Sequence, residues 1–280
     1  MSPTGCNPNV QFMEDVISST ANPAVKRLQS LIRSNRKRRD EGVVIIEGVK
    51  EINAALLGGY TFTELYICRD IFSSGDLVER IKDSAAVTLS VKFITSKVYE
   101  TLAYRESRQG IIAMALPKKH TLQELKLCSN PLVLVIEAVE KPGNLGAILR
   151  TADAAGVDAV IICDPLADIY NPNVIRSGVG CVFFQQMAVA ESAEAIYWLK
   201  CRQIRICATA LPATQIYTDE DYRQPTALVM GSEAQGLSRI WFDSADVLVK
   251  IPMLGKTDSL NVSTSTAIVL FEAVRQREMR

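Results

Sequence analysis

The sequence has one histidine and no paired cysteine motif, which limits the metal chemistry that it can support. His120 lies in a polar stretch directly after Lys118 and Lys119, and the seven cysteines are scattered without any C-x-x-C pair. Structural zinc sites and disulfide frameworks need closely spaced, paired ligands. We therefore expect no zinc site, no disulfide framework and no resident metal.

Long apolar runs are missing as well. No segment approaches the roughly 18 to 20 apolar residues of a membrane-spanning helix. The stretch from Met1 to Glu14 lacks the basic and apolar regions of a signal peptide. Because 48% of the residues are hydrophobic and 22% are charged, the composition is that of a globular protein. We expect a cytoplasmic protein that does not associate with membranes.

An excess of either charge is also missing, since 31 basic residues balance 31 acidic ones. A neutral sum does not by itself favour a nucleic-acid-binding protein. The distribution does, because no acidic residue interrupts the cations between Lys26 and Arg39. We expect this segment to contact RNA phosphates, although a solvated helix face is the alternative. The candidate RNA-binding residues are Lys26, Arg36, Lys37, Arg38 and Arg39.

Short apolar runs alternate with helical patterns in the first part of the chain. This alternation predicts a small α/β domain over residues 1–118, with a polar N-terminal tail. The expected helices cover residues 22–35, 51–57 and 76–84, and the expected strands cover residues 43–46, 62–68 and 109–115.

After a polar boundary at residues 117–130, the pattern sharpens into a second predicted domain at 131–280. Its strands are apolar on both faces, which is typical of a parallel sheet covered by helices. The strands are expected at 132–136, 159–162, 204–208, 227–230 and 247–251, and the helices at 145–155, 193–200, 237–242 and 264–277.

Three polar, glycine-bearing loops follow strands of this second domain, at 137–150, 231–236 and 252–263. Ligands of open α/β sheets bind beyond the carboxyl ends of the strands. None of the loops carries G-x-G-x-x-G, and Leu237 stands where a P-loop has its lysine. A nicotinamide-dependent enzyme, one rival interpretation, is therefore disfavoured.

The first loop offers two candidate side chains. Asn144 stands where the N-cap of the next helix is expected. Arg150 lies off the apolar stripe of that helix, over small residues, so that it either reaches toward a ligand or remains solvated.

The other two loops offer polar groups and an apolar surface. Glu233 follows a buried strand, where a carboxylate serves catalysis or interacts with a helix N-terminus. The third loop opens with an apolar stretch suited to an adenine ring and a thioether. One of Ser259, Asn261 and Ser263 is expected to cap the final helix.

Taken in order, these loops resemble the three signature motifs of the SpoU (TrmH-like) RNA 2′-O-ribose methyltransferases, within the SPOUT class. The motifs are Asn144-Leu145-Gly146 with Arg150-Thr151, then Gly231-Ser232-Glu233 to Gly236, and then Ile251-Pro252-Met253 with Ser259-Leu260-Asn261-Val262-Ser263. Residues 19–26, Glu47-Gly48 and Gln109-Gly110 resemble the substrate-binding domain of many such enzymes, which is similar to the L30e/L7Ae fold.

The resemblance implies features that periodicity does not supply. It implies a trefoil knot in the C-terminal domain, where the pattern alone predicts an unknotted sheet. It also implies a homodimer with the site near the dimer interface, and S-adenosylmethionine as the cofactor. The implied catalytic residues are Arg150, Asn144, Glu233, Ser259 and Asn261. The implied cofactor-binding residues are Thr209, Ala210, Leu211, Gly231, Ile251, Met253 and Leu260.

The expected reaction is methyl transfer to a ribose 2′-oxygen of structured RNA, with ribosomal RNA favoured and transfer RNA as an alternative. Arg150 either accepts the proton or fixes the adjacent phosphate. The first role is demanding, because guanidinium pKa values lie above about 12. A non-catalytic RNA-binding or assembly factor on the same fold is the remaining rival.

Overall fold

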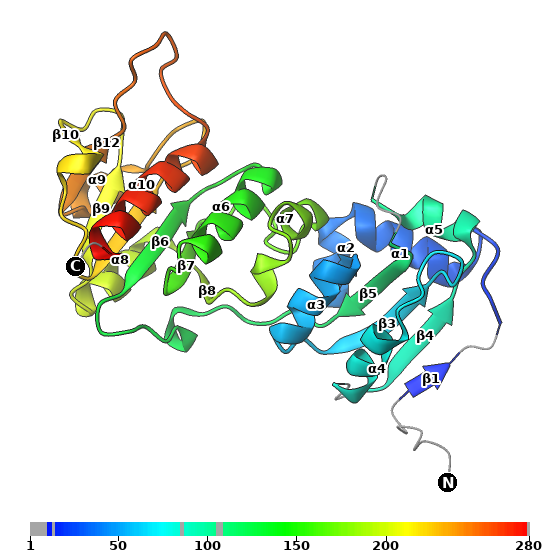
Figure 1. Ribbon diagram of the computed structural model, residues 1–280. Coiled ribbons are helices and arrows are strands. Elements are labelled where there is room, and N and C mark those ends of the chain that lie inside the picture. The colour runs from blue at the N-terminus through cyan, green and yellow to red at the C-terminus, as the bar shows by residue number, and fades with distance from the viewer. Residues whose placement is uncertain (1–9, 13–14, 85–86, 105–108, 279–280) are drawn as a thin grey trace. The chain divides into compact units, whose positions relative to one another are not determined.

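The computed structural model describes residues 10–12, 15–84, 87–104 and 109–278, which form two compact units (Figure 1). The first unit contains the chain up to Lys118 together with Tyr170–Phe184. The second contains Lys119–Ile169 and the chain from Gln185 onward. The sequence predicts one continuous domain over 131–280, whereas Tyr170–Phe184 belongs to the first unit.

The first unit is built on a five-stranded mixed sheet in the order β1-β4-β3-β5-β2. Strand β5 runs antiparallel to β2 and β3, and the other pairs are parallel. The strands are β1 (Val10–Phe12), β2 (Val44–Glu47), β3 (Phe62–Ile67), β4 (Leu89–Phe93) and β5 (Ile111–Ala115). The helices are α1 (Pro23–Arg33), α2 (Asn35–Glu41), α3 (Val49–Leu57), α4 (Gly75–Asp83), α5 (Ser96–Leu102) and α7 (Pro172–Ser177), followed by the 3₁₀ turn η2 (Cys181–Phe183).

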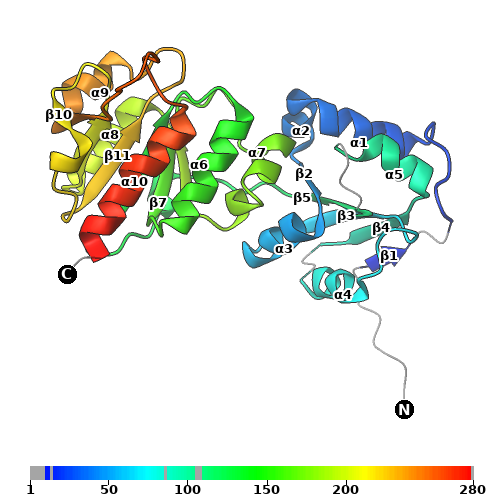
Figure 2. The same cartoon turned by 45° about the horizontal axis from the view of Figure 1, so that its top comes forward.

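Helices α1 and α5 cover one face of this sheet, and α3 and α4 cover the other (Figure 2). Helix α1 starts at Pro23 because proline suits the first helical position, and the Asn22 side chain accepts from the Ala24 N–H at 2.9 Å. It ends at Arg33, and the next residue, Ser34, caps α2 with its hydroxyl. The cations from Arg36 to Arg39 thus lie on a second helix, beyond the one helix predicted over 22–35.

The second unit is built on a seven-stranded sheet in the order β10-β12-β9-β11-β6-β7-β8. Every pair in it is parallel, which confirms the predicted parallel sheet. The strands are β6 (Leu132–Glu137), β7 (Ala159–Cys163), β8 (Met187–Ala190), β9 (Arg205–Thr209), β10 (Gln215–Ile216), β11 (Thr226–Met230) and β12 (Val247–Lys250). The helices are α6 (Pro142–Ala154), α8 (Ser192–Cys201), α9 (Arg239–Ser244) and α10 (Val262–Glu278), with 3₁₀ turns η1 (Leu122–Glu124) and η3 (Tyr217–Asp219).

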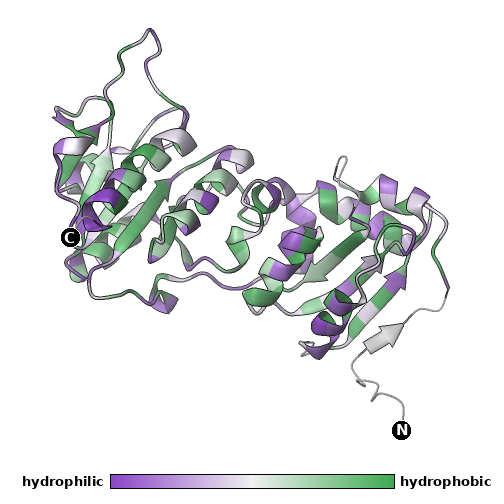
Figure 3. Cartoon of the chain, viewed as in Figure 1, coloured by the Kyte–Doolittle hydropathy of each residue, from purple (hydrophilic) through white to green (hydrophobic). Residues whose placement is uncertain are grey.

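Helices on both faces bury the central strands of this sheet. Helices α6 and α10 lie on one face, and α8 and α9 contribute Leu199 and Trp241 to the core on the other (Figure 1). Every residue of β6, β7 and β11 is buried, and Figure 3 shows β6 and β7 as hydrophobic. Among the helices of the described residues, none is both long and apolar enough to span a membrane.

The strand order brings the predicted loops together. Strands β12, β9, β11 and β6 are neighbours and all parallel, so that their carboxyl ends meet at one edge of the sheet. The loops that follow β6, β11 and β12 are the three loops singled out in the sequence. Their convergence is therefore a consequence of the topology.

Candidate active site

A cavity of about 570 Å³ lies at this edge of the sheet, within the second unit. Its lining comes from the chain after β9, β11 and β12 and from the start of α10. The lining includes all seven residues that the resemblance implied for the cofactor, namely Thr209, Ala210, Leu211, Gly231, Ile251, Met253 and Leu260. It also includes Glu233, Ser259 and Asn261.

Asn144 joins the three loops at the rim of this cavity. Its Nδ2 donates to Glu233 Oε1 at 2.5 Å, and its Oδ1 accepts from Asn261 Nδ2 at 3.2 Å. The predicted N-cap role of Asn144 is wrong: α6 begins at Pro142, with Lys141 as its N-cap, because proline favours the first helical position. The Asn144 side chain is consequently free to bridge the loops.

Glu233 is held as an ionised acceptor. Burial alone would raise its pKa, but hydrogen bonds from Asn144 and from the backbone, together with the charge of Lys141, lower the pKa below its ordinary value. The Glu140 N–H contributes one of these bonds, to Glu233 Oε2 at 3.4 Å. An ionised carboxylate can only accept hydrogen bonds, which fixes the orientation of the Asn144 amide.

The turn after β11 requires glycine at its first position. A Cβ on Gly231 would lie 2.2 Å from the carbonyl carbon of Gly236 and 2.4 Å from Leu237 N. Ser232 and Gly236 close this turn with reciprocal backbone hydrogen bonds of 3.0 and 3.1 Å. Only glycine therefore allows the turn to close in this way, and Gly231 itself lines the cavity.

The lining fits the cofactor that the resemblance implies. Met253 and Leu260 offer apolar contact for an adenine ring and a thioether. The Thr209 hydroxyl oxygen is buried without a hydrogen-bond partner in the described chain, so that it remains open to a polar ligand atom. Lys141 and Lys250 also line the cavity and suit the carboxylate of an amino acid moiety. Lys141 lies within the predicted loop 137–150 and Lys250 within the predicted strand 247–251, but the sequence motifs assign a role to neither.

Asn261 and Arg150 occupy different positions relative to the cavity. Asn261 Oδ1 accepts from the N–H and the hydroxyl of Ser263 at 2.9 and 2.6 Å, so Asn261 is the residue that caps α10. Arg150 is exposed on α6 and does not line the cavity. It lies six residues after Asn144, about 9 Å further along the helix axis. No ion pair with Arg150 is found within the described residues.

A buried carboxylate that the sequence analysis left without a role anchors the loop after β11. Glu137, at the end of β6, accepts from Ser238 N at 2.8 Å and from the Ser192 hydroxyl at 3.2 Å, and it also binds the Ser238 hydroxyl. The Ser192 hydroxyl in turn accepts from Trp241 Nε1 at 2.9 Å. This network ties β6, α8 and α9 together beneath the turn that carries Glu233.

The basic segment forms an exposed surface on the first unit, with one exception. Lys26, Lys37 and Arg39 are exposed, as is Arg36, which lies 3.7 Å from Asp40. Arg38 is only 3% exposed and donates to the Leu31 carbonyl at 2.8 Å, so that it holds the end of α1. The prediction that Arg38 contacts RNA is therefore corrected.

Both halves of the chain match families of known proteins. The profile of the SpoU rRNA Methylase family matches residues 131–271, and that of the MRM3-like substrate binding domain matches residues 22–113. The chain is 41% identical over 204 residues to a 23S rRNA (guanosine-2′-O-)-methyltransferase RlmB of Haemophilus ducreyi, covering 69% of this chain and 82% of that one. It is 28% identical over 272 residues to a 23S rRNA (uridine(2479)-2′-O)-methyltransferase of Streptomyces viridochromogenes, covering 92% of each.

Solved structures agree with this placement. A crystal structure of an RNA 2′-O ribose methyltransferase superposes with a TM-score of 0.80 at 36% identity, covering 94% of this chain and 99% of that one. The AdoMet-bound rRNA methyltransferase from Sinorhizobium meliloti superposes with a TM-score of 0.83 at 28% identity, covering 95% and 98%. The resemblance predicted from the three loops is confirmed: the chain is an RNA methyltransferase that belongs to the SpoU rRNA methylase family.

Proposed function

We propose that this protein transfers a methyl group from S-adenosylmethionine to the 2′-oxygen of a ribose in ribosomal RNA. The observation that carries the proposal is the bridge made by Asn144, which holds Glu233 and Asn261 together beside the cavity. Ribosomal RNA is favoured over transfer RNA because the two relatives compared above are both named for 23S rRNA.

The second unit supplies the cofactor site. When bound, S-adenosylmethionine provides an electrophilic methyl group on a sulfonium. Gly231 lines this site, and Thr209 offers its unpartnered hydroxyl. Met253 and Leu260 exclude water from the apolar part. A site that holds the methyl group and the oxygen about 3 to 3.5 Å apart and aligned provides much of the rate acceleration.

Arg150 acts on the RNA from outside the cofactor cavity. Its exposed position on α6 favours a grip on the phosphate beside the target ribose over acceptance of the ribose proton, which its high pKa also disfavours. Asn144, fixed by Glu233, positions the RNA backbone at the cavity rim. Ser259 and Asn261 complete the polar wall.

We further propose that the protein works in the cytoplasm as a homodimer with a knotted C-terminal segment, as the family resemblance implies. Large apolar side chains support a dimer, because Leu254 is 97% and Phe271 is 46% exposed in the second unit. Sedimentation equilibrium at micromolar concentration should give twice the chain mass of 30.8 kDa. A monomer with full methyl transfer activity would reject the dimer.

The function is tested by offering the purified protein 23S ribosomal RNA and total transfer RNA in parallel with labelled S-adenosylmethionine. We expect label in ribosomal RNA. Label in transfer RNA alone would show that the substrate is transfer RNA and not ribosomal RNA. Cofactor binding by calorimetry without transfer to either RNA would favour the non-catalytic rival.

A further inference from the structure

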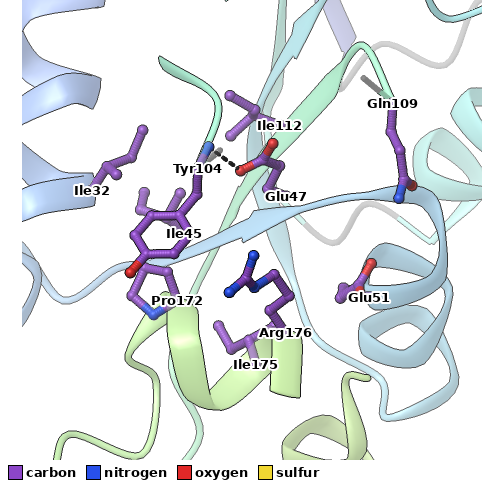
Figure 4. A pocket seen from close by; sticks show the side chains of 10 residues that line it. All are labelled: Ile32, Ile45, Glu47, Glu51, Tyr104, Gln109, Ile112, Pro172, Ile175 and Arg176. Atoms are coloured by element: carbon purple, nitrogen blue, oxygen red, sulfur yellow. Dashed lines mark hydrogen bonds between the residues drawn. The ribbon is translucent and has the colours of Figure 1, made fainter. Parts of the chain in front are cut away.

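The first unit contains a smaller cavity of about 150 Å³ (Figure 4). Isoleucines form much of its walls, including Ile45 on β2, Ile112 on β5 and Ile175 on α7. Tyr104 and Pro172 close one side. A cavity of this volume with apolar walls accommodates a six-membered ring.

Two dipeptides singled out in the sequence, Glu47-Gly48 and Gln109-Gly110, meet at this cavity. Glu47 is engaged in structure, because its Oε2 accepts from Tyr104 N at 2.8 Å and its Oε1 from the Tyr99 hydroxyl at 3.3 Å. Gly48 leaves room for the side chain of Glu51 on α3, because a Cβ at position 48 would lie 2.4 Å from the Oε2 atom of Glu51. Glu47 and Gly48 therefore shape the cavity rather than bind a ligand.

Glu51 remains as an acceptor that the fold does not use. Its side chain lines the cavity and is only 8% exposed, yet its Oε2 has no hydrogen-bond partner in the described part of the chain. Burial raises the pKa of this carboxyl. A buried, unpartnered carboxyl oxygen destabilises the free protein, and a ligand that donates an N–H to it would relieve that cost.

Donors lie beside this acceptor. Gln109 Oε1 accepts from Val49 N at 2.5 Å, which leaves both N–H groups of its Nε2 as donors. The exposed guanidinium of Arg176 stands at the cavity, 5.2 Å from the centre of the Tyr104 ring (Figure 4). A ligand here would meet an acceptor, amide donors, a cation and an aromatic face.

We propose that this cavity receives one unpaired nucleobase of the RNA substrate. The base would contact Tyr104, donate a ring or exocyclic N–H to Glu51 Oε2 and accept from Gln109, while Arg176 binds the adjoining phosphate. Proteins that read single-stranded RNA combine these features, namely an aromatic face, hydrogen bonds to a base edge and cations for the backbone. The proposal rests on the proposed function only in taking RNA as the substrate.

A neighbouring groove gives the RNA strand a path to this cavity. The groove encloses about 410 Å³ and shares Ile32, Tyr104 and Pro172 with the cavity. Its remaining lining includes Arg33 on α1 and Asn35 at the start of α2, the helix with the exposed cations. This charge favours a polyanion over an apolar peptide as the occupant.

The test titrates the full-length protein with each of the four ribonucleoside 5′-monophosphates and follows its isoleucine methyl groups by NMR. S-adenosylhomocysteine is kept saturating, so that nucleotides cannot report from the cofactor cavity. We expect the Ile45, Ile112 and Ile175 signals to shift while Ile161, in the core of the second unit, does not. Absence of shifts at millimolar nucleotide, or equal shifts with ribose 5-phosphate, which lacks a base, would overturn the proposal.

A pair of variants separates ligand binding from folding. Glu51→Leu should weaken nucleotide binding at least tenfold without lowering the melting temperature, because Oε2 has no native hydrogen bond to lose. Glu47→Leu, the matched control, should lower the melting temperature because it removes two hydrogen bonds. If Glu51→Leu does not fold, Glu51→Ala, which also removes the acceptor, provides the same test of affinity. Unchanged affinity in the Glu51 variant overturns the assignment of Glu51, whether or not methyl transfer is observed.

Discussion

Asn144 donates to Glu233 across 89 residues of sequence, at 2.5 Å. The bond joins the first turn of α6 to the turn after β11. Because Asn144 Oδ1 also accepts from Asn261 Nδ2, one amide sets the spacing of three loops around the cavity. Loops held in this way keep catalytic groups in place without relying on the ligand.

Replacing Asn144 by alanine should therefore lower kcat about 100-fold, because misplacement by about 1 Å has an effect of this size. Cofactor affinity should stay within a few-fold, since Asn144 does not line the cavity. Steady-state kinetics and calorimetry measure the two quantities. Asn53→Ala, which removes a hydrogen bond to the Val49 carbonyl in α3, is the control and should keep its kcat. Equal losses in both variants would contradict a positioning role for Asn144.

The carboxylate of Glu233 makes stability depend on pH in a defined direction. Its folded-state pKa is lowered, so the ionised form stabilises the protein above the ordinary value of 4.5. That contribution is lost as the pH falls through the folded-state pKa. The difference in unfolding free energy between wild type and Glu233→Gln should thus be constant from pH 6 to 8 and shrink below about pH 4.5. Urea titrations at several pH values measure it, and a difference that grows on acidification would contradict the assignment.

Arg150→Ala should abolish methyl transfer while leaving cofactor affinity within a few-fold, because Arg150 lies outside the cavity lining. Arg150→Lys should restore part of the activity if the group binds phosphate, since lysine retains the charge but not the planar fork. Arg239→Ala, which removes another exposed arginine of the second unit, is the control. Near wild-type turnover in Arg150→Ala would show that the catalytic assignment is wrong.

Gly231→Ala should reduce cofactor affinity and lower the melting temperature, because the added methyl group would lie 2.2 Å from a backbone carbon. Gly255→Ala is the matched control in the third loop, where a Cβ meets no atom within 4 Å. Calorimetry and thermal unfolding should leave the control unchanged. Wild-type affinity and melting temperature in Gly231→Ala would show that the turn does not depend on glycine at this position.

The exposed cations of α2 should act through the RNA backbone. Replacing Arg36, Lys37 and Arg39 together by alanine should weaken the binding of RNA to a similar extent whatever the RNA sequence. It should also flatten the slope of log K against log salt by about 0.7 to 0.9 per lost phosphate contact. Arg38→Ala should instead lower the melting temperature, because its buried guanidinium holds the end of α1. Filter binding over a salt series measures the slope, and an unchanged slope would favour the solvated-face alternative.

Much of the second unit could be predicted because its strands are apolar on both faces, and periodicity identifies such runs directly. The sequence does not predict the strands β8 and β10 of this unit, because four residues or fewer leave little periodic signal. It does not predict the helix α7 of the first unit either, because α7 has only six residues and several of them are polar. The residues that line the cavity were predicted from the order of the three motifs and their resemblance to the family. Periodicity alone does not indicate that these residues share one site.

The errors at Asn144 and Arg38 have physical causes. Two signals in the sequence compete for the start of α6: asparagine favours the N-cap position, and proline favours the first helical position. The proline two residues before Asn144 prevails, and the helix therefore starts upstream of Asn144. The burial of Arg38 depends on the turn at Ser34 that folds α2 against α1. Only the tertiary fold distinguishes it from the exposed Arg36, Lys37 and Arg39.

The most direct measurement of the central claim is alkaline hydrolysis of 23S ribosomal RNA after transfer from methyl-labelled S-adenosylmethionine. A methylated 2′-oxygen cannot attack the adjacent phosphate, so wild-type protein should place the label in an alkali-resistant dinucleotide, and Arg150→Ala should not. Label recovered in mononucleotides, as methylation of a base would produce, would contradict the account.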